Sequence, residues 1–134
     1  SANEYMAMAH AVKCTIWLRQ LFIEMKLGDM VSEPTRLLAD NNTANGWAGD
    51  QMFKVSNGNM WILQSFHYAR EMCQAGHIKV EYVNTKYNIS DLFTKGVSKE
   101  TFIALEGYLT GRLPISELFE AISKQMEQKD EDMS

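Results

Sequence analysis

The chain has 134 residues, of which 46% are hydrophobic and 22% charged, and its formal net charge is −4. This length predicts one domain with a real core, and the composition is that of an ordinary globular protein. No apolar run is long enough to cross a membrane, and no basic segment followed by an apolar one opens the chain. We therefore expect an intracellular protein, or a processed fragment, without a membrane span.

The negative charge is concentrated near the C-terminus. Residues 124–134 hold two basic and four acidic side chains, which leaves 11 basic and 13 acidic residues elsewhere, a net charge of −2. A protein that grips a phosphate backbone normally has a clustered excess of Lys and Arg. The charge balance weighs against autonomous nucleic-acid binding.

The two cysteines, Cys14 and Cys73, lie in segments with a helical pattern. Neither has a partner at the spacing of metal ligands, so a zinc site is not indicated. We expect two small buried thiols rather than a disulfide.

A long helix is predicted over residues 3–26. Its apolar residues follow two lines at helical spacing, Tyr5, Ala9, Val12, Ile16 and Ile23 in the first and Trp17, Leu21 and Met25 in the second. Leu18 and Phe22 widen the stripe, so the second half is apolar on most sides. Such a helix either is buried on more than one face or requires a partner.

The remaining elements are expected in the order strand, short helix, helix, strand and further helices. The ranges are 35–40 for a strand ending in Asp40, 41–45 for the short helix, 60–76 for a helix, 77–83 for a strand, a helix start within 88–95, and helices over 98–109 and 114–128. We expect residues 129–134 to be a disordered acidic tail. Because two strands alone form a marginal sheet, this sheet should need a partner surface.

Four stretches carry a family resemblance. They are Ser-Ala-Asn-Glu-Tyr-Met-Ala at 1–7 with Trp-Leu-Arg-Gln-Leu at 17–21, Leu-Ala-Asp-Asn-Asn-Thr-Ala at 38–44, Phe-His-Tyr-Ala-Arg-Glu at 66–71 with Gly-His-Ile-Lys-Val-Glu-Tyr-Val at 76–83, and Asn-Ile-Ser-Asp-Leu-Phe-Thr-Lys at 88–95. In this order and spacing, residues 1–109 resemble the C-terminal two-thirds of the ribonuclease H domain of copia-type retrotransposon polyproteins. The resemblance implies an α/β, helix-rich, truncated ribonuclease H-like fold over 1–111, with a helical extension over 112–128.

The resemblance also implies hydrolysis of the RNA strand of an RNA–DNA hybrid by two Mg²⁺ ions about 4 Å apart. Glu4, Asp40 and Asp91 match three of the family's four acidic ligands, and oxygen ligands suit Mg²⁺. Each residue also has a simpler interpretation. Asp40 could cap a helix, Asp91 could be a first-turn acid favoured by the helix dipole, and Glu4 could be solvated.

The chain departs from the family in two places. The family's first catalytic Asp and its three opening strands have no match. In the family the first strand lies beside the strand expected at 35–40, so that edge and one face of helix 3–26 should be bare. Where the family has a polar stretch, this chain has Met60-Trp61-Ile62-Leu63, which suits either a core or a protein interface.

Two functional hypotheses follow. In the first, the chain is a domesticated, catalytically incomplete pseudoenzyme, without a cofactor, that binds a protein partner or forms a homo-oligomer. The expected interface residues are Met60, Trp61, Leu63, Trp17, Leu21 and Phe22. In the second, it is part of an active ribonuclease H that uses Mg²⁺ on RNA–DNA hybrids, with the remaining strands and the first Asp supplied from elsewhere.

Overall fold

The computed structural model describes the backbone of residues 2–40, 43–44 and 60–134 and the side chains of residues 3–40, 43–44 and 64–134. The chain divides into two compact units, Ser1–Tyr82 and Val83–Ser134. The length had predicted one domain. The division arises because the C-terminal helices bury apolar residues of their own, Leu105, Leu118 and Ile122, apart from the main hydrophobic cluster.

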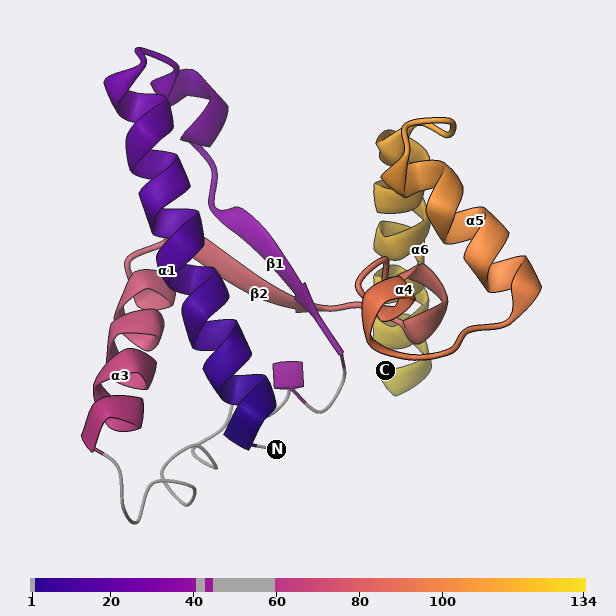
Figure 1. The fold of residues 1–134 in the computed structure, drawn as a ribbon, viewed down its shortest axis with the longest axis horizontal. Helices are drawn as coiled ribbons and strands as arrows, with labels where there is room; N and C mark the ends of the chain where they lie inside the picture. The colour runs from indigo at the N-terminus through magenta and orange to yellow at the C-terminus, as the bar shows by residue number, and fades with distance from the viewer. Residues whose placement is uncertain (1, 41–42, 45–59) are drawn as a thin grey trace. The chain divides into compact units, whose positions relative to one another are not determined.

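The first unit alternates helices and strands (Figure 1). Its elements are helix α1 (Ala2–Glu24), the short 3-10 helix η1 (Gly28–Val31), strand β1 (Thr35–Ala39), helix α3 (Met60–Gln74) and strand β2 (Ile78–Tyr82). The bounds of α1, β1, α3 and β2 agree with the predicted ranges to within two residues, whereas η1 was not predicted. The short helix predicted over 41–45 is described only at residues 43–44, which are helical.

The two strands pair in parallel. Thr35 lies opposite Ile78 and Ala39 opposite Tyr82. Among the described residues the sheet contains only these strands, so each has one edge that no described strand covers. Parallel sheets are normally larger and covered on both faces, and a two-stranded sheet contributes little stability by itself.

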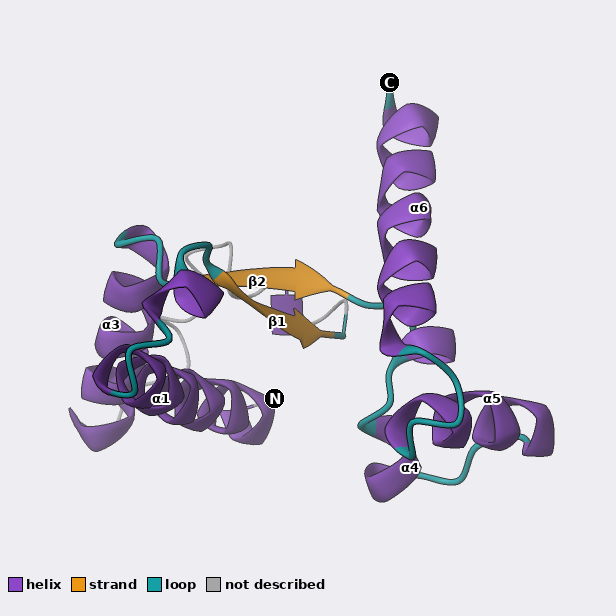
Figure 2. Ribbon diagram, turned by 90° about the horizontal axis from the view of Figure 1, so that it is seen from above, coloured by secondary structure: helices purple, strands orange, loops and turns teal. Residues whose placement is uncertain are grey.

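One face of the sheet packs against both helices. The buried cluster combines residues from all four elements, Met8, Ala9 and Val12 of α1, Ala39 of β1, Phe66 and Ala69 of α3, and Ile78 of β2. The rings of Tyr5 and Phe66 meet edge to face, with centroids 6.1 Å apart and an interplanar angle of 88°. Figure 2 shows α1 and α3 together on the same side of the strands. The molecule is thus α/β and rich in helix, as the sequence predicted.

The second unit is helical. It contains η3 (Thr85–Tyr87), α4 (Asp91–Thr94), α5 (Lys99–Leu109) and α6 (Ile115–Met133). Ser98 caps α5, since its hydroxyl accepts a hydrogen bond from the Thr101 amide at 3.2 Å. The helix start predicted within 88–95 corresponds to the single turn of α4.

Helix α6 extends further than expected. Residues 129–134 were predicted to be disordered, but the helix continues through Met133. The segment contains neither Gly nor Pro after Pro114 and is rich in Glu, Gln, Lys and Met, which have high helix propensity. Glu120 and Lys124 add a favourable pair one turn apart.

The cysteines also differ from expectation. Both are free thiols, but Cys14 is exposed and Cys73 only half-buried, because Cys14 lies on the face of α1 that points away from the core cluster. Among the described helices, none combines the length and the apolar character required to cross a bilayer.

Candidate functional site

Glu4 and Asp40 lie at the same end of the first unit. Glu4 is exposed in the first turn of α1, and Asp40 is exposed directly after β1. Their neighbours Tyr5 and Ala39 belong to the same apolar packing. Figure 1 shows the N-terminus of α1 and the end of β1 at one end of the unit. The fold thus brings two of the three predicted ligands to one region.

Asp40 has a local structural role. Its Oδ1 accepts a hydrogen bond from the Thr43 amide at 3.0 Å, and its carbonyl oxygen accepts one from the Ala44 amide at 2.9 Å. This is the geometry of a helix N-cap. The presence of an acid at position 40 therefore has an explanation that requires no metal ion.

Asp91 lies in the second unit, in the first turn of α4, and only 7% of its surface is exposed. The side chain of Asn88 donates to Oδ1 at 3.4 Å. The ammonium group of Lys95, one turn later, lies 3.0 Å from Oδ2, although Oδ2 receives no hydrogen bond of good geometry. Asn88 also accepts a hydrogen bond from the Ser90 amide at 3.2 Å. The ends of the Asn88–Lys95 motif thus hold its central acid in place.

These acids do not form a recognisable metal centre. In the described part of the chain, no three His, Cys, Asp or Glu side chains are grouped so that they could hold a metal ion. Glu4 and Asp40 belong to the first unit and Asp91 to the second. Their joint role as metal ligands stays a prediction.

The second half of α1 exposes a continuous apolar surface. Cys14, Trp17, Leu18 and Leu21 of α1, and Met25 in the turn directly after it, are spaced so that they share one face, and we call this set the α1 stripe. Trp17 is 64% exposed, Leu18 47%, Leu21 39% and Met25 59%. Of the two interpretations of this helix, burial on several faces is therefore wrong for the isolated chain.

The predicted interface residues divide into three groups. Trp17 and Leu21 lie on the surface, within the α1 stripe. Phe22 is half-buried. The side chains of Met60, Trp61 and Leu63, at the start of α3, lie outside the described residues, so the choice between core and interface stays open for them.

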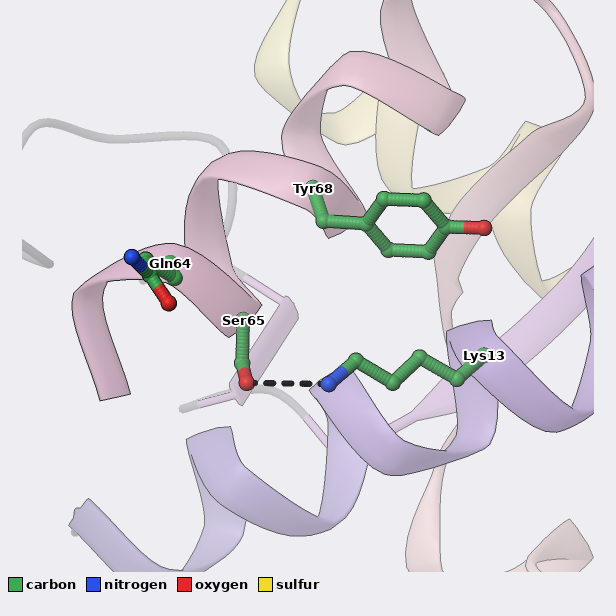
Figure 3. Close-up of a pocket in the computed structure, with 4 residues that line it drawn as sticks. All are labelled: Lys13, Gln64, Ser65 and Tyr68. Carbon is green, nitrogen blue, oxygen red and sulfur yellow. Dashed lines mark hydrogen bonds between the residues drawn. The ribbon is translucent and has the colours of Figure 1, made fainter. Parts of the chain in front are cut away.

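Two hollows flank Lys13. The first has a volume of about 390 Å³, and the described residues that line it are Lys13, Cys14, Trp17 and Leu18; we call it the α1 hollow. The second, of about 230 Å³, lies between α1 and α3, and the described residues that line it are Lys13, Gln64, Ser65 and Tyr68 (Figure 3). There the Lys13 ammonium donates a hydrogen bond to the Ser65 hydroxyl at 3.1 Å. No pattern in the sequence indicated this pair, because the two residues meet only when α1 packs on α3.

An ion cluster around the buried Glu81 occupies the sheet face opposite the core. Glu81 is 8% exposed, its Oε2 lies 2.6 Å from Arg36 Nε, and its Oε1 lies 3.1 Å from Lys79 Nζ. Burial raises the pKa of Glu81, but the hydrogen bonds and positive charges of Arg36 and Lys79 outweigh it, so the pKa lies below its ordinary value. The strand pattern placed Lys79 and Glu81 on one face, whereas Arg36 joins them only through the strand register.

No protein-family model matches this chain, and no solved structure matches it. The ribonuclease H-like assignment therefore depends on the sequence motifs.

Proposed function

We propose that this chain is a retrotransposon-derived, ribonuclease H-like subunit that acts through protein interaction rather than catalysis. The observation that carries the proposal is the α1 stripe, which exposes four large apolar side chains on one face. Contiguous apolar surface of this kind usually marks an interaction site. Full burial of each such side chain is worth about 1.5–3 kcal/mol, so a partner surface there would be strongly favoured.

One edge of β1 that no described strand covers supports the same function. Strand β2 occupies one edge of β1. The family resemblance places a further strand beside residues 35–40, and the opposite edge of β1 is where such a strand would pair. An open edge presents unpaired backbone donors and acceptors, which commonly bind an extended segment of another chain.

The three predicted acidic ligands give weaker support to a function without catalysis. Three of the family's four acidic ligands have a match in these 134 residues, and two of the three have local partners, Thr43 for Asp40 and Lys95 for Asp91. A two-ion site needs several converging carboxylates. Because these partners already hold Asp40 and Asp91, both acids have structural roles that do not depend on ion binding.

The alternative function is a part of an active ribonuclease H. Glu4, Asp40 and Asp91 would hold two Mg²⁺ ions, and the remaining strands and first Asp would come from elsewhere. The placement of Glu4 and Asp40 at one end of the unit favours this reading. It is the second candidate, because Asp40 and Asp91 already have local structural partners.

A cleavage assay separates the two functions. The chain would be incubated with a labelled RNA–DNA hybrid and Mg²⁺ or Mn²⁺, beside the Asp40→Asn variant. Asn is as good an N-cap as Asp, so this variant should fold. We expect no cleavage above the level of Asp40→Asn. An exposed acid outside the motifs, tested as Asp130→Asn, provides the matched control. Cleavage that disappears in Asp40→Asn and persists in Asp130→Asn would establish the enzyme and overturn our proposal.

A further inference from the structure

We infer that the hollow between α1 and α3 binds a small aromatic carboxylate, and that the Lys13 ammonium recognises its carboxylate group. We call this site the α1–α3 hollow. The inference goes beyond the proposed function, because it concerns a small ligand and not a protein partner. It depends on three observations, which are the position of the hollow at the rim of the core, the polar groups that line it, and its volume.

The α1–α3 hollow lies at the rim of the contact between the two helices. Lys13 directly follows Val12, which is fully buried, and Ser65 directly precedes Phe66, which is 5% exposed. Val12 and Phe66 belong to the same core cluster. The packing of the first unit therefore fixes the distance between the two walls of the hollow.

The α3 wall offers hydrogen-bonding groups beside an aromatic ring. Gln64 and Tyr68 are four residues apart and Ser65 and Tyr68 are three apart, so the three side chains share one side of α3. They carry an amide, an aliphatic hydroxyl and a phenol. Tyr68 also packs partly against the core cluster, which restricts its ring. A ligand with both a polar group and a flat apolar body would match this wall.

The α1 wall supplies a positive charge. Figure 3 shows the Lys13 side chain reaching from α1 to α3, where its Nζ donates a hydrogen bond to Ser65 Oγ at 3.1 Å. An ammonium group has three N–H donors, and this bond uses one of them while it holds the group at the hollow. Hydrogen bonds from a charged donor to a carboxylate are stronger than those between neutral groups.

The charge of the site favours a monoanion. Among the described residues that line the hollow, Lys13 is the only charged one. A single ammonium matches the single charge of a carboxylate. Sites for phosphate dianions commonly add an Arg fork or the N-terminus of a helix, and the described lining comes from the interior of α1 and α3. The site therefore suits a carboxylate better than a phosphate.

The volume sets the size of the ligand. The hollow measures about 230 Å³. A cavity of about 150 Å³ is enough for benzene, whereas sites for drug-sized ligands begin at about 300 Å³. One ring with one carboxylate group therefore fits. Because Lys13 and Gln64 are exposed, the ligand would stay partly in contact with water, and we expect a dissociation constant on the order of 1 mM.

Titration with benzoate tests the site. Benzoate added to the full chain should shift the backbone amide NMR signals of residues 13 and 64–68 in a saturable way. Benzyl alcohol has the same ring without the charge and should bind at least about tenfold more weakly, the loss expected for one charge-assisted hydrogen bond. Inorganic phosphate should not saturate these shifts up to about 10 mM.

Three variants test the assignment of the groups. Lys13→Met keeps an unbranched side chain of high helix propensity and removes the charge, so benzoate affinity should fall at least about tenfold. Ser65→Ala removes the group that holds the ammonium and should weaken binding about threefold. Lys99→Met is the matched control, because it removes an exposed lysine from α5 and should leave the affinity unchanged.

The contrary results are equally specific. Absence of saturable benzoate binding, or binding that Lys13→Met does not weaken, overturns the inference. Benzyl alcohol or phosphate that binds as tightly as benzoate overturns the assignment to a carboxylate. None of these measurements involves a nucleic acid or a second protein, so each outcome is independent of the proposed function.

Discussion

Glu81 is nearly buried between two cations, Arg36 from the neighbouring strand and Lys79 from its own. The Arg36 guanidinium joins β1 to β2 across the sheet face that does not contact the core cluster. Because these partners hold the pKa of Glu81 below its ordinary value of 4.5, the ionised carboxylate favours the folded chain.

The pH dependence of stability tests this assignment. A carboxyl group whose folded-state pKa is lowered stabilises the fold above its unfolded pKa, and this contribution is lost as the pH falls through the folded-state value. Urea unfolding between pH 3 and 7 should therefore show a free energy of unfolding that declines below about pH 4.5. In Glu81→Gln this decline should be smaller. The exposed acid Glu117, changed to Gln, should leave the pH profile unaltered, and an identical profile in Glu81→Gln would refute the assignment.

At the scale of elements, the turn from α5 to α6 depends on a close backbone approach. The Leu113 amide donates to the Gly107 carbonyl oxygen at 2.8 Å. A Cβ atom at Gly107 would lie 2.8 Å from both Arg112 Nη2 and Leu113 Cδ1 and 3.0 Å from Leu113 Cγ. A methyl group at Gly107 would therefore force the side chains of Arg112 and Leu113 to shift.

Gly107→Ala should destabilise the second unit. Overpacking of this kind costs about 1–3 kcal/mol, against about 1 kcal/mol that Ala gains over Gly inside a helix, so we expect a net loss of up to about 2 kcal/mol in denaturant unfolding. Gly96→Ala is the matched control, since nothing lies within 4 Å of a Cβ atom there. Equal stability of the two variants would contradict the proposed clash.

At the scale of the whole molecule, the net charge of −4 predicts weak contact with nucleic acid. Non-specific binding by basic proteins has dissociation constants of roughly 10⁻⁴ to 10⁻⁶ M at physiological salt. This chain should bind an RNA–DNA hybrid more weakly than that range, as measured by fluorescence anisotropy at about 150 mM salt. Micromolar affinity with a steep salt dependence would instead reveal a basic surface and favour the nuclease alternative.

Much of the secondary structure was predictable because it depends on local pattern. The period of α1 and α3, the alternation of β2 and the capping residue Ser98 all act within a few positions of the chain. A helix N-cap at Asp40 was likewise predicted, as the alternative to a metal ligand. The end of α6 was missed because charge alone suggested disorder, whereas helix propensity favours continuation through Met133.

The candidate site was predictable only in part. Sequence reasoning named Trp17 and Leu21 as interface residues, but Lys13 and the α1 hollow emerged from the structure. The helical pattern identified two apolar lines along α1 but did not predict which of them is buried. The first line is buried from Ala9 to Val12 and half-buried at Ile16, while Ile23 is exposed, because the contacts of α1 with the core cluster end at Ile16.

By itself, the sequence determined the order of helices and strands and the motifs on which the family resemblance depends. Only the tertiary structure decided which face of α1 is exposed, how Arg36 reaches Glu81, and that Asp91 is buried. The physical reason is that periodicity and capping are properties of neighbouring residues, whereas burial and ion pairing depend on segments that meet only after folding.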